Sequence, residues 1–266
     1  MIELQATPDP LVWKLDVTDT ICAGSINAPF LFGGSGLGAL IAAMAASSNQ
    51  PPVWATAQYL SYVKPPVVAD IRVSIESAGK HITQATAALF VEDRKVITAS
   101  GALGKRATTA VGSWITAPNT AAPETYPKVN HRLGYPEGVE KSIELRLVSG
   151  RYPVEGQEFD QPSDGRMLLW ARPSSRQPIT PDILAIIGDF VAAGSSHALG
   201  RFSAGNSLDN TIRFISAEPT DWVLCDIRIE AASAGFIHGS MFMFSQHGAL
   251  MAIASTTLIL RLPDSH

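Results

Sequence analysis

The sequence predicts an α+β protein made of two copies of one unit, each an antiparallel β-sheet wrapped around one central helix. The first observation is an internal repeat: residues 71–79 and 227–235 are identical at five of nine positions and lie 156 residues apart. The second is that the flanking segments recur in the same order in both halves. The third is a single helix-like segment in each half, which favours an antiparallel sheet over the alternating helices and strands of a parallel one.

The first half is expected to begin with a strand and to continue with its helix. Residues 11–17 form the strand candidate, and residues 32–47 form an apolar stretch of helical length. Four strand-like segments follow, at residues 56–63, 71–79, 82–91 and 96–103. The turn at Glu92, Asp93 and Arg94 predicts a hairpin between the last two segments.

The second half repeats this order. A strand candidate at residues 167–172 precedes an apolar helix at residues 182–197. The later strands are expected at residues 210–216, 227–235, 237–244 and 250–262. The turn at Gln246, His247 and Gly248 again predicts a hairpin.

One helix enclosed by an antiparallel sheet is the hotdog arrangement, so the chain is expected to be a tandem double hotdog. We predict an N-terminal hotdog at residues 1–107, a linker at residues 108–140 and a C-terminal hotdog at residues 141–266. The linker includes a stretch rich in Ala, Thr and Pro, and residues 152–165 are expected to form a further long loop. The two sheets should pair edge to edge, with binding sites at the seam between the halves.

Composition excludes several classes of protein. The 266 residues are 46% hydrophobic and carry a net charge of −4, without a Lys/Arg-rich segment, so a nucleic-acid partner is not expected. The longest apolar run, residues 37–46, is too short to cross a bilayer, and the N-terminus does not resemble an export signal. We therefore expect a cytoplasmic protein without membrane insertion. Cys22 and Cys225 lie in separate halves without metal-ligand spacing and are expected to be ordinary buried thiols.

Several short motifs, in their order along the chain, resemble the acyl-CoA thioesterase II family. They are Phe32-Gly33-Gly34, the helix at residues 182–190, Ser207-Leu208-Asp209-Asn210, the segment at residues 222–226 and the final strand to Arg261. The resemblance covers nearly the whole chain. It implies an acyl-CoA substrate and a hydrolytic water held by a helix Asp, a Thr or Ser before the next strand, and a Gln on the last strand. By position these correspond to Asp189, Ser207 and Thr256.

Three positions depart from the family pattern. Thr256 replaces the Gln, and its neighbours Ser255, Thr257 and Leu258 would not restore one. Ser35 stands where the family has a Gln, and residues 59–66 replace a strand that contains a His and ends in Arg-Pro-Gly.

The residues themselves support a hydrolytic site. Asp189 lies in an otherwise apolar helix, where an unpaired carboxylate would be costly, and it is too far from Asp182 to cap the start of its own helix. Ser207 could hold a water, although its surroundings would also suit a plain turn. Asp209 would share a face with Ser207 on a regular strand, whereas Asn210 would point away, so Asp209 is a candidate for a second polar contact.

The glycine-rich run at residues 33–38 has two interpretations besides a dinucleotide site. A nicotinamide cofactor is rejected because no acidic residue occurs between Gly36 and Asp70 to hold its ribose. Small residues would let the helix pack closely, and free N–H groups at Gly33 and Gly34 could contact the substrate carbonyl. Packing is the simpler interpretation, and the carbonyl contact is the more specific one.

Three functions remain open from the sequence. The first is thioester hydrolysis with Asp189 as general base, Ser207 and Thr256 as partners, and neither a metal nor an organic cofactor. The second is an acyl-CoA-binding protein that has lost turnover. The third is a hotdog enoyl-CoA hydratase, which the absence of an Asp-x-x-x-x-His pattern disfavours. A covalent serine mechanism is disfavoured because a Gly-x-Ser-x-Gly motif is missing. Self-association is left open, because hotdog sheets often associate further.

Overall fold

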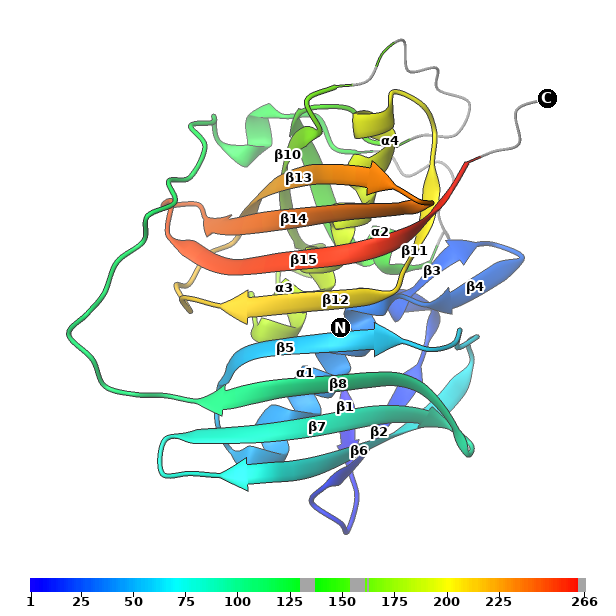
Figure 1. Cartoon of the computed structure of the whole chain (residues 1–266), viewed down its shortest axis with the longest axis vertical. Coiled ribbons are helices and arrows are strands. Elements are labelled where there is room, and N and C mark those ends of the chain that lie inside the picture. Colours follow the sequence, from blue (N-terminus) through cyan, green and yellow to red (C-terminus); the bar gives the residue numbers. More distant parts are fainter. Residues whose placement is uncertain (130–136, 154–160, 162, 263–266) are drawn as a thin grey trace.

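The computed structural model describes residues 1–129, 137–153, 161 and 163–262. One continuous antiparallel sheet curves around the helices of both halves (Figure 1). Its strand order is β1-β2-β6-β7-β8-β5-β12-β15-β14-β13-β10-β9, with β11 also paired to β15. This is the predicted tandem double hotdog.

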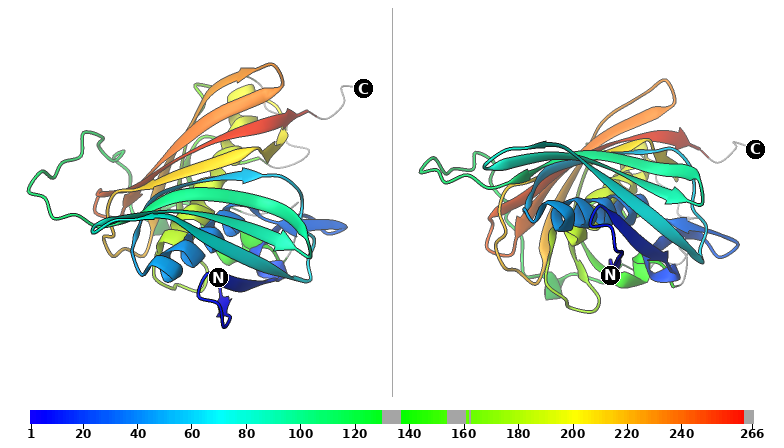
Figure 2. Two further views of the ribbon diagram at one scale, coloured as in Figure 1. Left: turned by 60° about the horizontal axis from the view of Figure 1, so that its bottom comes forward. Right: turned by 90° about the horizontal axis from the view of Figure 1, so that it is seen from below.

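The first half contains one long helix and all five of its predicted strands. The strands of the main sheet are β1 (Leu4–Ala6), β2 (Val12–Val17), β5 (Pro52–Tyr59), β6 (Val67–Ala78), β7 (Ile82–Val91) and β8 (Arg94–Gly104). The helix is α1 (Gly33–Ser48), and a separate hairpin, β3 (Cys22–Ser25) and β4 (Ala28–Leu31), precedes it. Figure 2 shows α1 lying in the concave side of the sheet.

The second half repeats this plan. Its strands are β9 (Ile143–Ser149), β10 (Arg166–Pro173), β11 (Ala204–Ser207), β12 (Asp209–Phe214), β13 (Val223–Ser233), β14 (Phe236–Ser245) and β15 (Leu250–Arg261). Its helical segments are α3 (Pro181–Gly188), the 3₁₀ helix η3 (Asp189–Ala193) and α4 (Gly194–Leu199). The short helices η1 (Asp19–Ile21), η2 (Pro123–Thr125) and α2 (Val139–Ser142) lie outside the two core helices.

Some predicted elements differ from the structure. The strand predicted at residues 56–63 is β5, which begins at Pro52 and ends at Tyr59. Beyond it the N–H groups of Leu60 and Ser61 both donate to the Val96 carbonyl, which ends the regular ladder. The single helix predicted at residues 182–197 is instead three segments, with a 3₁₀ turn that begins at Asp189. Strands β1, β3, β4 and β11 were not predicted, because they have only three or four residues each. Strand β9 was also missed, although Ile143 to Leu147 alternate between apolar and charged residues. Much of the loop predicted at residues 152–165 lies outside the described residues.

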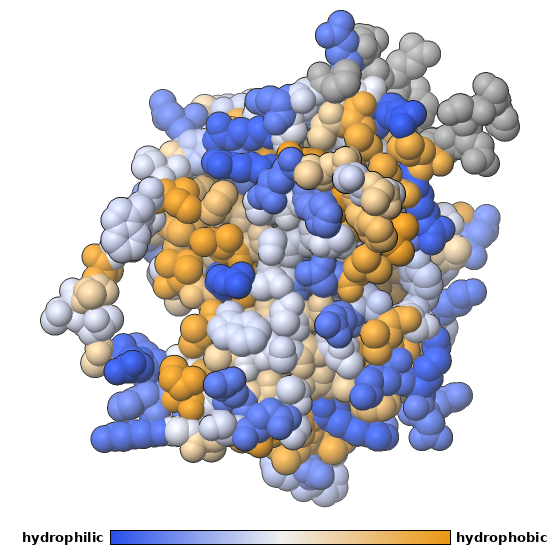
Figure 3. All heavy atoms as spheres, viewed as in Figure 1, coloured by the Kyte–Doolittle hydropathy of each residue, from blue (hydrophilic) through white to orange (hydrophobic). Residues whose placement is uncertain are grey.

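The seam between the halves is the antiparallel pair β5 and β12. Thr56 and Thr211 face each other at its centre, and their Oγ1 atoms are 2.7 Å apart. This is the edge-to-edge pairing expected from the repeat. Seen from its outer face, the sheet carries charged and polar groups with apolar side chains between them (Figure 3).

Small residues bring the two core helices together. A Cβ atom at Gly34 would lie 2.9 Å from the Ala185 carbonyl oxygen, and one at Gly38 would lie 2.9 Å from that of Asp182. Side chains at these positions would therefore push α1 away from α3. The close packing predicted for the glycine-rich run is present. The glycines pack against the other core helix as well as against the sheet.

Two composition-based expectations bear on the core. Cys22 and Cys225 are both buried and free, and burial raises the pKa of the Cys22 thiol to about 12. Residues Pro181–Leu199 are long and apolar enough to span a membrane by length and composition, but most of this stretch is buried within the protein. It is the core helix of the second half.

Candidate active site

Asp189 is held at the junction of the two halves by three hydrogen bonds. The backbone N–H of Gly34, at the start of α1, donates to Oδ2 over 2.7 Å. Ser207 Oγ and Asn210 Nδ2 donate to Oδ1 over 3.2 Å and 3.1 Å. The carboxylate is 3% exposed. The structure therefore brings Asp189 and Ser207 together, as the sequence predicted.

The environment of Asp189 tunes its proton affinity in two directions. Burial raises the pKa of the carboxyl group to about 6, while the hydrogen bonds from Gly34, Asn210 and Ser207 hold it lower than burial alone would. The positive end of the α1 dipole also favours the ionised form. Asp189 is thus a carboxylate at neutral pH, with a pKa close enough to 7 for general-base catalysis.

The carboxylate retains capacity for one more donor. A carboxylate offers about four lone-pair sites, and the three hydrogen bonds leave one of them on Oδ2. Asp189 also caps α1, since it accepts the Gly34 N–H at the start of this helix. The N-cap residue Phe32 makes no side-chain cap hydrogen bond of its own. The capping interpretation is therefore valid, but for the helix of the other half.

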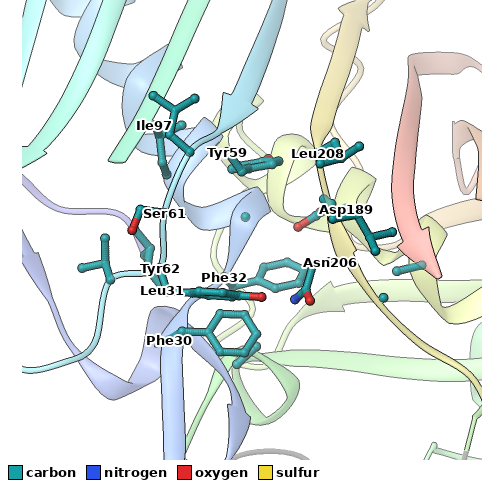
Figure 4. Close-up of a pocket in the computed structure, with 18 of the residues that line it drawn as sticks. Phe30, Leu31, Phe32, Tyr59, Ser61, Tyr62, Ile97, Asp189, Asn206 and Leu208 are labelled. Carbon is teal, nitrogen blue, oxygen red and sulfur yellow. The ribbon is translucent and has the colours of Figure 1, made fainter. Parts of the chain in front are cut away.

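A cavity of about 510 Å³ opens beside Asp189 (Figure 4). Phe30, Phe32 and Tyr59 are among its lining residues from the first half, and Leu208 and Ile259 line it from the second. The ring of Phe32 packs against that of Phe190 at a centroid distance of 5.4 Å. A largely apolar cavity with one buried carboxylate is suited to an apolar group that carries one reactive polar bond.

The start of α1 borders this site. Gly33 lines the cavity, and a Cβ atom there would lie 2.7 Å from Asp189 Oδ2. Within the described part of the chain, the Gly33 N–H has no hydrogen-bond acceptor, as expected for the first residue of a helix. Gly33 and Gly34 therefore have different roles: Gly33 faces the cavity, and Gly34 holds the carboxylate.

Thr256 does not contact Asp189. Its hydroxyl donates to the backbone carbonyl of Asp209 over 2.6 Å, and it does not line the cavity. In the pairing of β11 with β15, Leu258 lies opposite Ser207. The residue beside Ser207 on the last strand is therefore apolar.

Asp209 and Asn210 are oriented opposite to the expectation from strand alternation. Asp209 Oδ1 accepts the backbone N–H of Thr257 over 2.9 Å, whereas Asn210 reaches Asp189. The alternation fails because the chain changes from β11 to β12 at Leu208, between Ser207 and Asn210. Asn210, which strand alternation had set aside, is therefore a site residue, and its place in the Ser207–Asn210 motif was the available signal.

Among the described residues, no group of three or more His, Cys, Asp or Glu side chains is arranged to hold a metal ion. The Asp189 carboxylate lies among neutral donors and apolar walls, and Arg261 also lines the cavity.

Comparisons with known proteins agree with this fold. The sheet with two enclosed helices defines a double-hotdog protein, and a family model for the acyl-CoA thioesterase C-terminal domain matches residues 117–260. The chain belongs to this acyl-CoA thioesterase family. The resemblance stated from the sequence is confirmed.

Solved structures extend the match over the whole chain. A candidate thioesterase from Novosphingobium aromaticivorans is 27% identical, with a TM-score of 0.87, and the alignment covers 97% of this chain and 98% of the other. A hotdog protein of unknown function from Alicyclobacillus acidocaldarius is 18% identical, with a TM-score of 0.83 and coverages of 98% and 97%. A TesB protein from Mycobacterium avium subspecies paratuberculosis is 16% identical, with a TM-score of 0.75 and coverages of 98% and 96%. No curated protein sequence matches the chain.

Proposed function

We propose that this protein hydrolyses acyl-CoA thioesters to a free acid and CoA. The observation that carries the proposal is the Asp189 carboxylate, which is buried, has a pKa of about 6 and keeps one acceptor site beside an apolar cavity. Membership of the acyl-CoA thioesterase family supports the substrate class.

In the proposed reaction, Asp189 acts as general base. A water molecule on the free acceptor site of Oδ2 attacks the thioester carbonyl carbon, while Asp189 takes its proton. The C=O electrons move onto the oxygen, and the intermediate then expels the CoA sulfur, which receives the proton from Asp189. Thioesters are activated acyl donors, so one positioned water and one modest base are sufficient.

The neighbouring residues would support this step in different ways. Ser207 donates to Asp189, and its oxygen can accept a hydrogen bond from the attacking water. The Gly33 N–H at the start of α1 can donate to the developing oxyanion. Thr256 would act at a distance, through the Asp209 carbonyl that it binds. The apolar walls would hold the acyl group.

Acyl-CoA binding without turnover is the second candidate function. Leu258 beside Ser207 removes one polar contact that a water could use, and the three hydrogen bonds of Asp189 would also suit a purely structural cap. A hydratase is disfavoured further, because histidine is absent from the described residues that line the cavity. A cytoplasmic location and self-association stay predictions from the sequence.

The test is thiol release from a panel of short, long, branched and aromatic acyl-CoAs, with the wild type beside Asp189→Asn. Turnover by the wild type and its loss in the variant would support hydrolysis at this carboxylate. Equal turnover by both proteins would contradict the role of Asp189. Binding of acyl-CoA without thiol release would favour the second candidate, and hydration of a crotonyl thioester would favour the third.

A further inference from the structure

Tyr59 has a buried hydroxyl group without a partner in the described part of the protein. Most buried polar side-chain atoms form a hydrogen bond, because leaving one unpaired costs free energy of about 1–3 kcal/mol. Tyr59 is the last residue of β5, and its backbone N–H donates to the Leu208 carbonyl across the seam. The backbone of Tyr59 is therefore fixed by a hydrogen bond, whereas its hydroxyl group has no partner among the described residues.

The tip of Tyr59 lies beside the candidate active site. A Cβ atom on Gly33 would be 3.2 Å from the Tyr59 hydroxyl and 2.7 Å from Asp189 Oδ2, so these two oxygens flank one point above the start of α1. They are not hydrogen-bonded to each other. Tyr59 and Asp189 both line the cavity, where they are contributed by opposite halves of the chain (Figure 4).

The surroundings keep the Tyr59 hydroxyl protonated. Burial raises the pKa of the phenol well above its ordinary value, and the negative charges of Asp189 and Asp209 raise it further. The group is consequently a hydrogen-bond donor throughout the physiological range of pH. A donor with no acceptor in the protein is complementary to an oxygen atom on a ligand.

We propose that the Tyr59 hydroxyl donates a hydrogen bond to the thioester carbonyl oxygen and stabilises the oxyanion that forms when water attacks. This inference rests on the proposed thioester hydrolysis and adds a catalytic residue to it. The Gly33 N–H is the second donor, so the oxyanion is held between a backbone and a side-chain group. Preorganised donors of this kind contribute most where charge develops in a site that excludes water.

Tyr59→Phe is the decisive variant because it removes only the oxygen atom. The expected result is a fall in kcat of about 10²-fold, with KM changed by less than about threefold, because the contact strengthens in the transition state. The acidic limb of the pH profile stays at its wild-type position, since Asp189 is intact. Thermal unfolding stays near that of the wild type, because the hydroxyl makes no hydrogen bond within the described protein.

Tyr126→Phe is the matched control. It removes the same atom from a tyrosine outside the cavity, where the hydroxyl contacts Thr120 and Ala121, and kcat should be unchanged. If Tyr59→Phe unfolds, 3-fluorotyrosine at position 59 keeps the shape and makes the phenol a stronger donor, which should alter kcat without altering KM.

The outcomes separate this inference from the proposed function. Wild-type turnover that Tyr59→Phe retains in full would overturn the role of Tyr59 and leave hydrolysis by Asp189 standing. A rise in KM alone would also overturn it, because the contact would then serve binding and not the transition state. Absence of wild-type turnover on every thioester would overturn both.

Discussion

The two core helices occupy similar places in a duplicated fold, but only the second carries a buried carboxylate. Asp189 lies eight residues after Pro181, the first residue of α3, and the residue eight positions after Gly33 in α1 is the buried Ile41. The seam pairs Thr56 with Thr211, so Asn210 corresponds to Ala55 in the first half. One half therefore supplies the polar groups that the other has replaced by packing.

The two helix starts also differ in their backbone N–H groups. α1 begins with Gly33 and Gly34, whose N–H groups are free or bound to Asp189. α3 begins with Pro181, which has no N–H to donate, and carries Asp182 in its first turn. Among the described residues, the start of α1 therefore combines donor N–H groups with a carboxylate from the other half, and the start of α3 does not.

The largest expected effect comes from replacing Asp189, the carboxylate that only the second core helix carries. Asp189→Asn should lower kcat/KM by about 10³-fold, because the amide cannot accept the proton of water. Ile41→Val, at the counterpart position, should change activity by less than about twofold and lower the free energy of unfolding by about 1 kcal/mol. Thiol-release kinetics and chemical denaturation measure the two effects. A comparable loss of activity in Ile41→Val would show that the two positions are not functionally distinct.

Gly33→Ala tests whether the first residue of α1 can carry a side chain. Its Cβ would lie 2.7 Å from Asp189 Oδ2 and 3.0 Å from the Tyr59 ring, so both side chains would have to move. We expect kcat to fall by about 10²-fold, as for other displacements of about 1 Å in active sites. Gly112→Ala, in the exposed linker, is the control, because its Cβ would meet only the Trp114 ring at 3.4 Å or more. Full activity of Gly33→Ala would contradict the proposed geometry.

The pH dependence of activity reports the carboxylate directly. Below a pH of about 6 Asp189 is protonated, so kcat/KM should fall about tenfold for each further pH unit. A fall in kcat/KM that begins only near pH 4 would mean that a carboxyl group with an ordinary pKa acts as the base.

The same pKa shift affects stability in the opposite direction. The folded protein binds the Asp189 proton more tightly than the unfolded chain, so raising the pH from 4 to above 6 should cost up to about 3 kcal/mol at this group. Asp189→Asn removes this dependence, and the difference in unfolding free energy between the two proteins should change with pH in this window. A constant difference would show that the pKa is not raised.

Ser207→Ala should have a smaller effect. It removes one of the three donors to Asp189, and the loss of a hydrogen bond to a charged group corresponds to about tenfold in rate. Asn210→Ala should behave similarly, and the pKa of Asp189 should rise in both variants because each lost donor favoured the ionised form. An upward shift of the acidic limb checks this, and an unchanged limb would contradict it.

Thr256→Val is expected to have the smallest effect on activity. The methyl group keeps the shape, and the lost hydrogen bond to the Asp209 carbonyl should lower the free energy of unfolding by about 1 kcal/mol. The rate should change by less than about threefold. A loss as large as that of Asp189→Asn would restore Thr256 to the catalytic group.

The architecture was predictable from local sequence patterns. The repeat, the apolar helices and the alternating strands act over a few residues at a time, and they predicted two enclosed helices and an edge-to-edge seam. The sequence also predicted that Asp189 would be hydrogen-bonded or functional, because a carboxylate in an apolar helix needs a partner or a function, and the structure shows its partners. The predicted domain boundaries stay predictions.

Which side chains meet in the site depends on long-range packing. Asn210 turns toward Asp189 because the chain shifts between strands at Leu208, and Thr256 turns to the Asp209 backbone instead. Tyr59 reaches the site across the seam, and Gly34 meets Asp189 although they are 155 residues apart. Such contacts depend on how closely two helices and two sheet edges pack, and this distance is set by side chains from both halves together, which local sequence patterns do not encode.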